Sequence, residues 1–165
     1  MIPQPPRVMR HAILIVDDDP QARRQLRGLL AANGYAVVEA GNGRIARECL
    51  ADQDIDLVVS DIFMPECDGF ELIAAIGAIP RPVPVIAMSD HESWTGLAFL
   101  DAANDLGAAA VIEKPFRAHL LLRLIDDTLS LAGRSARVVA FDALTEPERN
   151  RVPAGLEWVG GRPAE

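Results

Sequence analysis

Five side chains that could do chemistry together each follow a short apolar run of the sequence: Asp17, Asp18, Asp61, Ser89 and Lys114. The apolar runs are residues 13–16, 57–60, 85–88 and 109–112. If the runs are parallel strands of one sheet, their carboxyl ends share an edge, and open α/β sheets bind ligands at that edge. The sequence therefore predicts a pocket that combines carboxylates, one hydroxyl and one ammonium.

The chemistry of this pocket can be inferred from its residue types. Asp17 and its two neighbours would face Asp61, and such a group of oxygens suits Mg²⁺, which prefers carboxylate, carbonyl and water ligands. Asp61 stands alone at the end of a nearly all-apolar strand, so we interpret it as a nucleophile that can form an acyl phosphate. Lys114 and Ser89 would contact the transferred oxygens, because phosphoryl transfer depends mainly on positioning and charge neutralisation.

Each of these residues has a plainer interpretation when taken alone. The aspartate run could be a solvated loop or a helix cap, and Lys114 could be an ordinary exposed lysine. Lys114 is, however, the only lysine in a chain with 16 Lys and Arg residues. One lysine among arginines suggests a need for a compact point charge rather than a planar fork.

Composition narrows the classes of protein and partner. The chain has 165 residues, half of them apolar, and a formal net charge of −8. This acidic balance argues against direct nucleic-acid binding, which needs Lys and Arg to neutralise phosphates. We find no signal peptide and no apolar stretch long enough to span a membrane. Two cysteines give no disulfide framework and fit a reducing compartment, so we expect a cytoplasmic protein.

Strand and helix patterns alternate along the chain. Strands are expected at residues 13–16, 35–39, 55–60, 85–88 and 109–112. Helices are expected at about residues 20–33, 42–50, 68–76, 94–106 and 116–132. This alternation predicts an α/β fold with a doubly wound parallel sheet. We expect a disordered lead at 1–10, one domain at 11–132, and an extension at 133–165 that is irregular or partly packed, with a short strand conceivable at 138–141.

Four motifs in this order resemble the receiver domain of two-component response regulators over about residues 11–132. They are ILIVDDDP at 13–20, VVSDIFMPECDG at 58–69, VIAMS at 85–89 and KPF at 114–116. The resemblance implies a flavodoxin-like (βα)5 sheet with strand order 2-1-3-4-5. It also implies that Asp61 is the phosphoacceptor, with Ser89 and Lys114 contacting the phosphoryl group. Asp17, Asp18, Asp61 and the backbone carbonyl of Phe63 would hold Mg²⁺, and the Lys114–Pro115 bond would be cis.

The same resemblance implies partners. A sensor histidine kinase or a histidine phosphotransfer protein would supply the phosphoryl group to a stand-alone receiver. Its output would be contact with a downstream protein, and the protein would not be an enzyme apart from self-catalysed phosphorylation and dephosphorylation. The fourth helix, fifth strand and fifth helix would offer a homodimer surface. Leu121, Leu122 and Ile125 fit that surface or a wide core stripe equally well.

Two alternatives remain open at this point. Asp90 follows Ser89 where the family usually has a small residue, and Val111 stands where many members have an aromatic residue. These two departures are the only support for a pseudo-receiver, which would be an interaction module that phosphorylation does not regulate. The Asp17-x-Asp19 pattern is also similar to that of Mg²⁺-dependent aspartyl phosphatases of the haloacid-dehalogenase type, although the downstream acidic pair of that family is missing.

Overall fold

A computed structural model describes residues 11–64, 69–90, 102, 105–132 and 158–159. Its main sheet has five parallel strands in the order β2-β1-β3-β4-β5. The strands are β1 (Ala12–Val16), β2 (Ala36–Ala40), β3 (Leu57–Asp61), β4 (Val85–Asp90) and β5 (Ala110–Lys114). The described helices are α1 (Pro20–Ala32), α2 (Gly43–Asp52), α3 (Gly69–Gly77) and α5 (Ala118–Ala132). The predicted doubly wound α/β fold and its strand order are confirmed.

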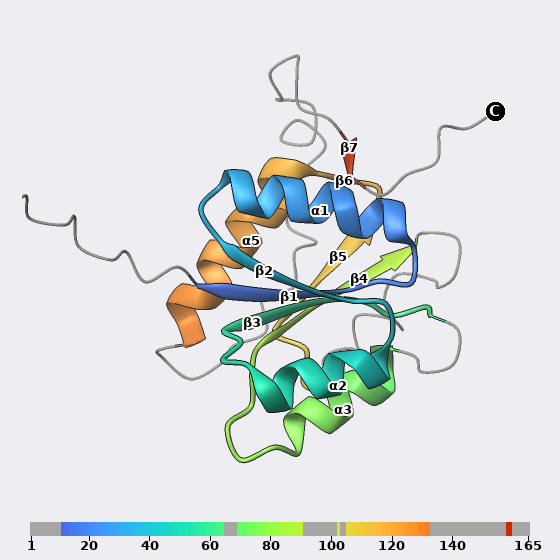
Figure 1. The fold of residues 1–165 in the computed structure, drawn as a ribbon, viewed down its shortest axis with the longest axis vertical. Coiled ribbons are helices and arrows are strands. Elements are labelled where there is room, and N and C mark those ends of the chain that lie inside the picture. Colours follow the sequence, from blue (N-terminus) through green and yellow to red (C-terminus); the bar gives the residue numbers. More distant parts are fainter. Residues whose placement is uncertain (1–10, 65–68, 91–101, 103–104, 133–157, 160–165) are drawn as a thin grey trace, which may run out of the picture.

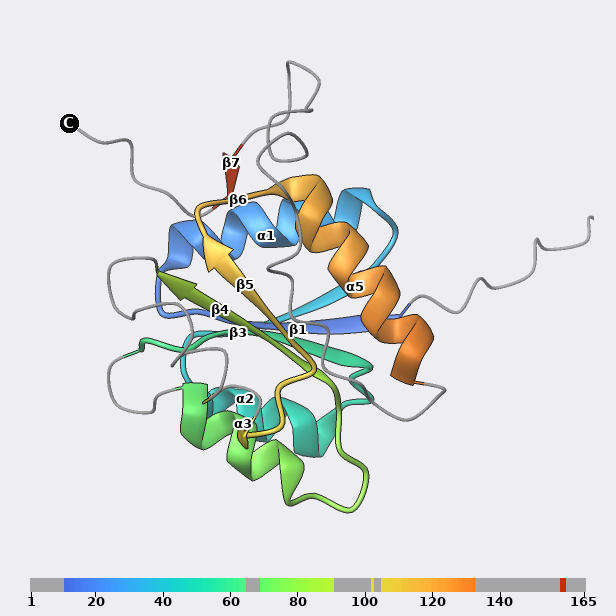
Figure 2. The same ribbon diagram turned by 180° about the vertical axis from the view of Figure 1, so that it is seen from behind.

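Helices cover both faces of the sheet. Figures 1 and 2 show α1 and α5 on one face, with α2 and α3 on the other. Along β1, Ile13 and Ile15 belong to the core cluster beneath α1 and α5, whereas Leu14 and Val16 belong to the opposite cluster. Successive side chains of a strand point to opposite faces. A strand that is covered on both faces is therefore apolar throughout, as the sequence of β1 is.

The helix next to the predicted pocket begins where the sequence signals a cap. The Asp19 carboxylate accepts a hydrogen bond from the amide of Gln21 at 2.8 Å, and Pro20 occupies the first helical position. Both features are typical of helix starts. The helix ends at Ala32 and Asn33 caps it. Gly34 follows with φ 89°, a left-handed conformation that glycine adopts without strain. The cap at Asp19 therefore makes α1 begin directly after the aspartate run.

The fifth helix starts later than predicted. We expected a helix from Phe116, but Phe116–Arg117 form a short strand, β6, and α5 begins at Ala118. The strand β6 pairs in an antiparallel manner with β7 (Trp158–Val159). Because β6 uses an extended backbone for this pairing, the helix cannot include it. None of the strands predicted from the sequence corresponds to β6 or β7.

Some predicted features lie outside the described residues, or are not decided by them. These are most of the helix at 94–106, the Asp68 cap and the strand considered at 138–141. The domain boundaries at residues 10 and 132 also stay predictions. In α5, Leu121 and Ile125 are fully buried and Leu122 packs partly against the same core. A wide core stripe accounts for all three leucine and isoleucine positions.

Two glycine substitutions should have opposite effects on stability. A Cβ at Gly69 would lie 2.6 Å from the Cα of Ile62 and still closer to the Asp61 carbonyl oxygen, whereas Gly28 in α1 has open space around it. Gly69→Ala should lower the free energy of unfolding by about 1–3 kcal/mol because backbone must move. Gly28→Ala should raise it by about 0.5–1 kcal/mol. Urea denaturation measures both. A Gly69→Ala variant as stable as the parent would contradict this packing.

Candidate functional site

One ammonium group lies between two buried carboxylates at the carboxyl edge of the sheet. The Lys114 Nζ atom is 3.0 Å from Asp17 Oδ2 and 2.9 Å from Asp61 Oδ2. The three residues are 8%, 1% and 4% exposed, respectively. In the sequence, Lys114 is 53 positions from Asp61 and 97 positions from Asp17. The predicted convergence of these distant side chains therefore occurs.

The sheet topology explains how Lys114 reaches Asp61 across a strand. Asp61 ends β3 and pairs with Met88 of β4, which in turn pairs with Ile112 of β5. Lys114 lies two residues beyond Ile112 and therefore on the same face of β5 as that residue. The last residue of β5 can thus extend its long side chain back over the end of β4. Asp17 follows β1, the other neighbour of β3.

Each buried carboxylate divides its two oxygens between the backbone and Lys114. Asp17 Oδ1 accepts from the Asp19 amide at 2.9 Å, and Asp61 Oδ1 accepts from the Phe63 amide at 3.0 Å. The Oδ2 atoms of both residues accept from Lys114. A carboxylate held at both oxygens cannot rotate freely, so these contacts preorganise the pocket.

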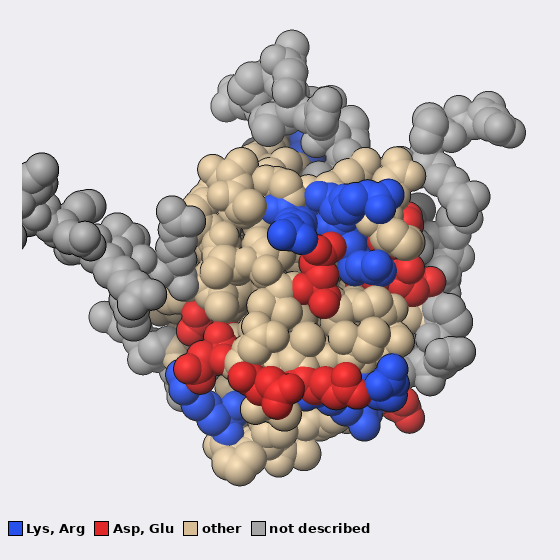
Figure 3. Space-filling view, viewed as in Figure 1, with Lys and Arg blue, Asp and Glu red and all other residues tan. Residues whose placement is uncertain are grey.

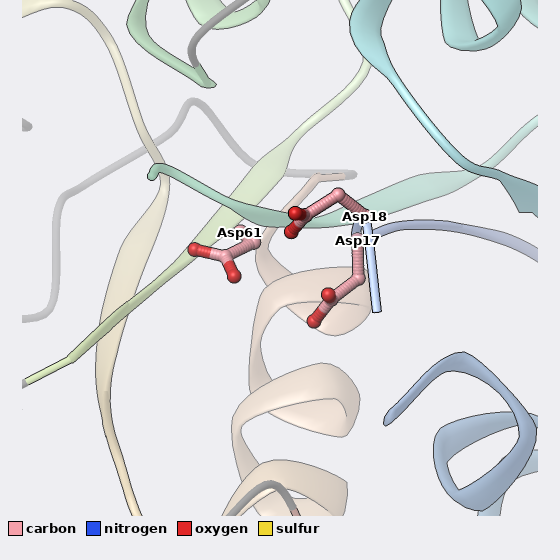
Figure 4. Close-up of side chains that lie close together, drawn as sticks. All are labelled: Asp17, Asp18 and Asp61. Carbon is pink, nitrogen blue, oxygen red and sulfur yellow. The ribbon is translucent and has the colours of Figure 1, made fainter. Parts of the chain in front are cut away.

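A third carboxylate completes an acidic cluster. Single oxygens of Asp17, Asp18 and Asp61 all lie within 4.8 Å of one another, and Asp18 is the exposed member. Figure 4 shows Asp17 and Asp18 at the end of β1 with their carboxylates directed toward the side on which Asp61 lies. Hard oxygen ligands of this kind fit Mg²⁺ or another hard divalent cation. The chemistry of the donor set therefore agrees with the predicted magnesium site.

The site holds more negative charge than Lys114 can balance. Burial raises the pKa of Asp61 and the Asp17 charge adds to this effect, whereas Lys114 acts in the opposite direction without overcoming it. Burial lowers the pKa of Lys114, but Asp17 and Asp61 raise it by more, so the net shift is upward. The pKa of Asp61 thus rises mainly through burial, whereas the pKa of Lys114 rises because two carboxylates face one ammonium. An added cation would relieve this imbalance.

The remaining predicted residues occupy positions near the cluster. Ser89 is 5% exposed and follows Met88, the strand partner of Asp61. Phe63 approaches Asp61 through its backbone amide. Val111 pairs with Ala87 and packs partly into the core on the α2 and α3 face. The Asp90 side chain lies outside the described residues. The Lys114–Pro115 bond is cis, as the resemblance implied.

Two supporting contacts were missed by the sequence analysis. The Arg23 side chain in α1 donates to the Asp17 carbonyl oxygen at 2.6 Å, which ties the helix to the end of β1. The Gly69 amide donates to the Ile62 carbonyl at 2.8 Å, which brings α3 against the backbone after Asp61. The sequence offered a weak signal for the second contact, a glycine after the aspartate that is predicted to cap the helix, and none for the first.

Comparisons with known proteins agree with this geometry. The family model for the response regulator receiver domain matches residues 13–126. Chemotaxis protein CheY of Bacillus subtilis is 38% identical over 123 residues, which cover 74% of this chain and all of CheY. Response regulator MprA of Mycolicibacterium vanbaalenii is 32% identical over 149 residues, covering 87% of this chain. The present chain spans only 63% of MprA and 26% of the transcriptional regulatory protein GlrR of Escherichia coli.

Solved structures give the same assignment. A CheY-like receiver domain protein from Methanospirillum hungatei superposes with a TM-score of 0.68 at 26% identity, covering 76% of this chain and 98% of that one. A response regulator from Chloroflexus aurantiacus superposes with the same TM-score at 25% identity, covering 73% of this chain and 98% of that one. With the family model matching more than half of its length, the chain belongs to the response regulator receiver domain family.

Proposed function

We propose that this chain accepts a phosphoryl group on Asp61 from a sensor histidine kinase or a histidine phosphotransfer protein. The observation that carries the proposal is the contact of 2.9 Å between Lys114 Nζ and Asp61 Oδ2 inside a cluster of three carboxylates. A buried carboxylate with an ammonium beside it suits attack on phosphorus, because the ammonium offsets the charge of the phosphoryl oxygens. The signal would leave by contact with a downstream protein.

The transfer follows from the positions of the side chains. An Asp61 carboxylate oxygen forms a bond to phosphorus as the bond from phosphorus to the donor imidazole nitrogen breaks, and that nitrogen keeps the electron pair. Lys114 neutralises negative charge on an oxygen of the transferred group, and the Ser89 hydroxyl donates to another. Such fixed charges and donors supply most of the catalysis in phosphoryl transfer. Beyond its own phosphorylation and dephosphorylation, we do not assign the chain an enzymatic activity.

Asp17, Asp18 and Asp61 would hold Mg²⁺ in this proposal, with the Phe63 backbone carbonyl as a further ligand. A bound magnesium ion supplies positive charge to oxygens of the transferring group. Burial raises the pKa of Asp61 and the Asp17 charge adds to this effect, so a cation bound between these carboxylates would favour their ionised forms. The Phe63 amide already holds Asp61, which places the Phe63 peptide beside the cluster.

The surface charges support protein rather than nucleic-acid partners. Figure 3 shows a row of acidic side chains over α2 and a basic group over α1. Part of that basic group is paired, since Glu39 lies 2.8 Å from Arg27 and 4.0 Å from Arg23. Among the described residues no helix has both the length and the apolar character to cross a bilayer. A cytoplasmic location and a homodimer through the fourth helix, β5 and α5 belong to the same proposal.

Phosphorylation should depend on one carboxylate. Acetyl phosphate with Mg²⁺ should label the chain, and Asp61→Asn should abolish labelling, because an amide cannot form the acyl phosphate. Removing Mg²⁺ with EDTA should also abolish labelling. Asp54→Asn is the matched control, since Asp54 is exposed and lies before β3, at the opposite edge of the sheet. Intact-protein mass spectrometry reads the result.

Two outcomes would contradict this function. An unlabelled parent chain under conditions that label CheY of Bacillus subtilis would favour the pseudo-receiver. Turnover of a phosphoester substrate by the parent chain, with loss in Asp61→Asn, would favour the phosphatase.

Removing the Asp61 charge should stabilise the metal-free protein. The folded-state pKa of Asp61 is raised, so at neutral pH its ionised form costs stability, and this cost disappears as the pH falls through the folded-state pKa. In EDTA at pH 7, Asp61→Asn should raise the free energy of unfolding by roughly 1 kcal/mol. The gain should shrink as the pH is lowered toward 4. Urea denaturation at several pH values checks this. An Asp61→Asn variant that is less stable than the parent at pH 7 would contradict the claim that ionised Asp61 lowers the stability.

A further inference from the structure

The small second sheet joins β7 to β6, which is separated from the end of β5 by one residue in the sequence. Phe116 of β6 pairs with Val159 of β7, and Arg117 pairs with Trp158. The Phe116 side chain is 3% exposed within the core cluster beneath α1 and α5, so β6 is firmly anchored. The backbone of β7 also contacts α1. β7 thus has a defined position against β6 and α1.

This docking position lies beside the proposed phosphoacceptor pocket. The strand β6 begins two residues after Lys114, and α1 begins three residues after Asp17. Both elements touched by β7 therefore lead directly out of the cluster. Figures 1 and 2 agree that β7 lies against β6 and α1 on the outside of that helix. The surface of β6 and α1 that β7 contacts therefore forms a rim next to the pocket.

We propose that β7 is a built-in competitor for proteins that deliver the phosphoryl group. The inference rests on the proposed function and adds its regulation. A protein donor buries about 800 Å² of its partner in an interface of standard size, which extends well beyond a pocket of three carboxylates. Docked β7 occupies part of that surface. A small donor such as acetyl phosphate needs only the pocket and is not excluded.

The pairing is suited to reversible release. Its ladder joins only two residues on each side, so few backbone hydrogen bonds hold it. Because β7 belongs to the same chain, its docking is intramolecular and needs no second molecule. Addition of a strand to an exposed edge relies on main-chain contacts rather than on particular side chains. A donor that binds the rim more tightly displaces β7.

Two variants of the full chain test the proposal: one opens the pairing of β6 with β7, and the other locks it. Trp158→Pro with Val159→Pro removes both amide donors of β7 and opens the pairing. Arg117→Cys with Trp158→Cys, in a Cys49→Ser and Cys67→Ser background, locks it, because antiparallel partners lie within disulfide range. Ala154→Pro is the control for a proline in the same extension. The reduced form of the cysteine variant is the control for the lock.

The readout is the rate of Asp61 labelling by two donors. One is acetyl phosphate, and the other is the phosphorylated histidine phosphotransfer domain that labels the open variant fastest in a panel. With the protein donor, the open variant should react about threefold faster than the parent, and the locked variant at least as much slower until it is reduced. With acetyl phosphate, all variants should react at the rate of the parent.

The outcomes distinguish a failure of the proposed competition by β7 from a failure of the proposed function of Asp61. Equal rates with the protein donor in the open, locked and parent forms would overturn the inference while leaving Asp61 as the phosphoacceptor. Equal shifts with both donors would also overturn it, because β7 would then act on the pocket itself. Failure of every protein donor to label even the open variant would overturn it as well. Absence of labelling by acetyl phosphate would overturn the proposed function, and the inference with it.

Discussion

The ammonium of Lys114 holds together the carboxyl ends of three strands. Its contacts with Asp17 and Asp61 connect β1, β3 and β5 at one edge of the sheet. Two carboxylates at this degree of burial would otherwise repel each other in a medium that screens poorly. Lys114 makes that arrangement tolerable without neutralising it fully. The residual negative charge gives the site its capacity for a hard cation.

The choice of lysine follows from this geometry. A single nitrogen within 3.0 Å of two oxygens from different residues acts as a point charge. An arginine fork matches the two oxygens of one carboxylate instead. The other Lys or Arg positions of the chain are arginines. Those described in ion pairs, such as Arg27 and Arg44, pair with carboxylates that are partly or fully exposed. The only lysine therefore stands where its shape matters.

Much of the fold and of the site could be predicted from the sequence. Apolar runs that end in polar residues indicate parallel strands, and the carboxyl ends of parallel strands meet, so the convergence of Asp61 and Lys114 followed from position alone. The β6 and β7 pairing could not be predicted, because two residues carry no periodicity. The role of Gly69 depends on a close approach to the Ile62 backbone, and that approach exists only once α3 is placed.

The ends of the strands are also harder to predict from the sequence than the strands themselves. The strand β5 was predicted to end at Ile112 but continues to Lys114, because Glu113 and Lys114 pair with Ser89 and Asp90. In the sequence, a polar residue after an apolar run indicates the end of a strand. In the structure, the strand continues as long as its backbone pairs with a neighbouring strand. Site residues at the ends of strands are therefore the ones whose local structure the sequence assigns least well.

The most direct test of the central interaction is a double-mutant cycle in metal-free buffer at pH 7. The gain in unfolding free energy from Asp61→Asn is measured in the parent chain and in a Lys114→Met background. If Lys114 offsets the Asp61 charge, the gain should be larger by at least about 1 kcal/mol in the Lys114→Met background. An equal gain in the two backgrounds would show that the ammonium does not stabilise Asp61, and would contradict this account of the site.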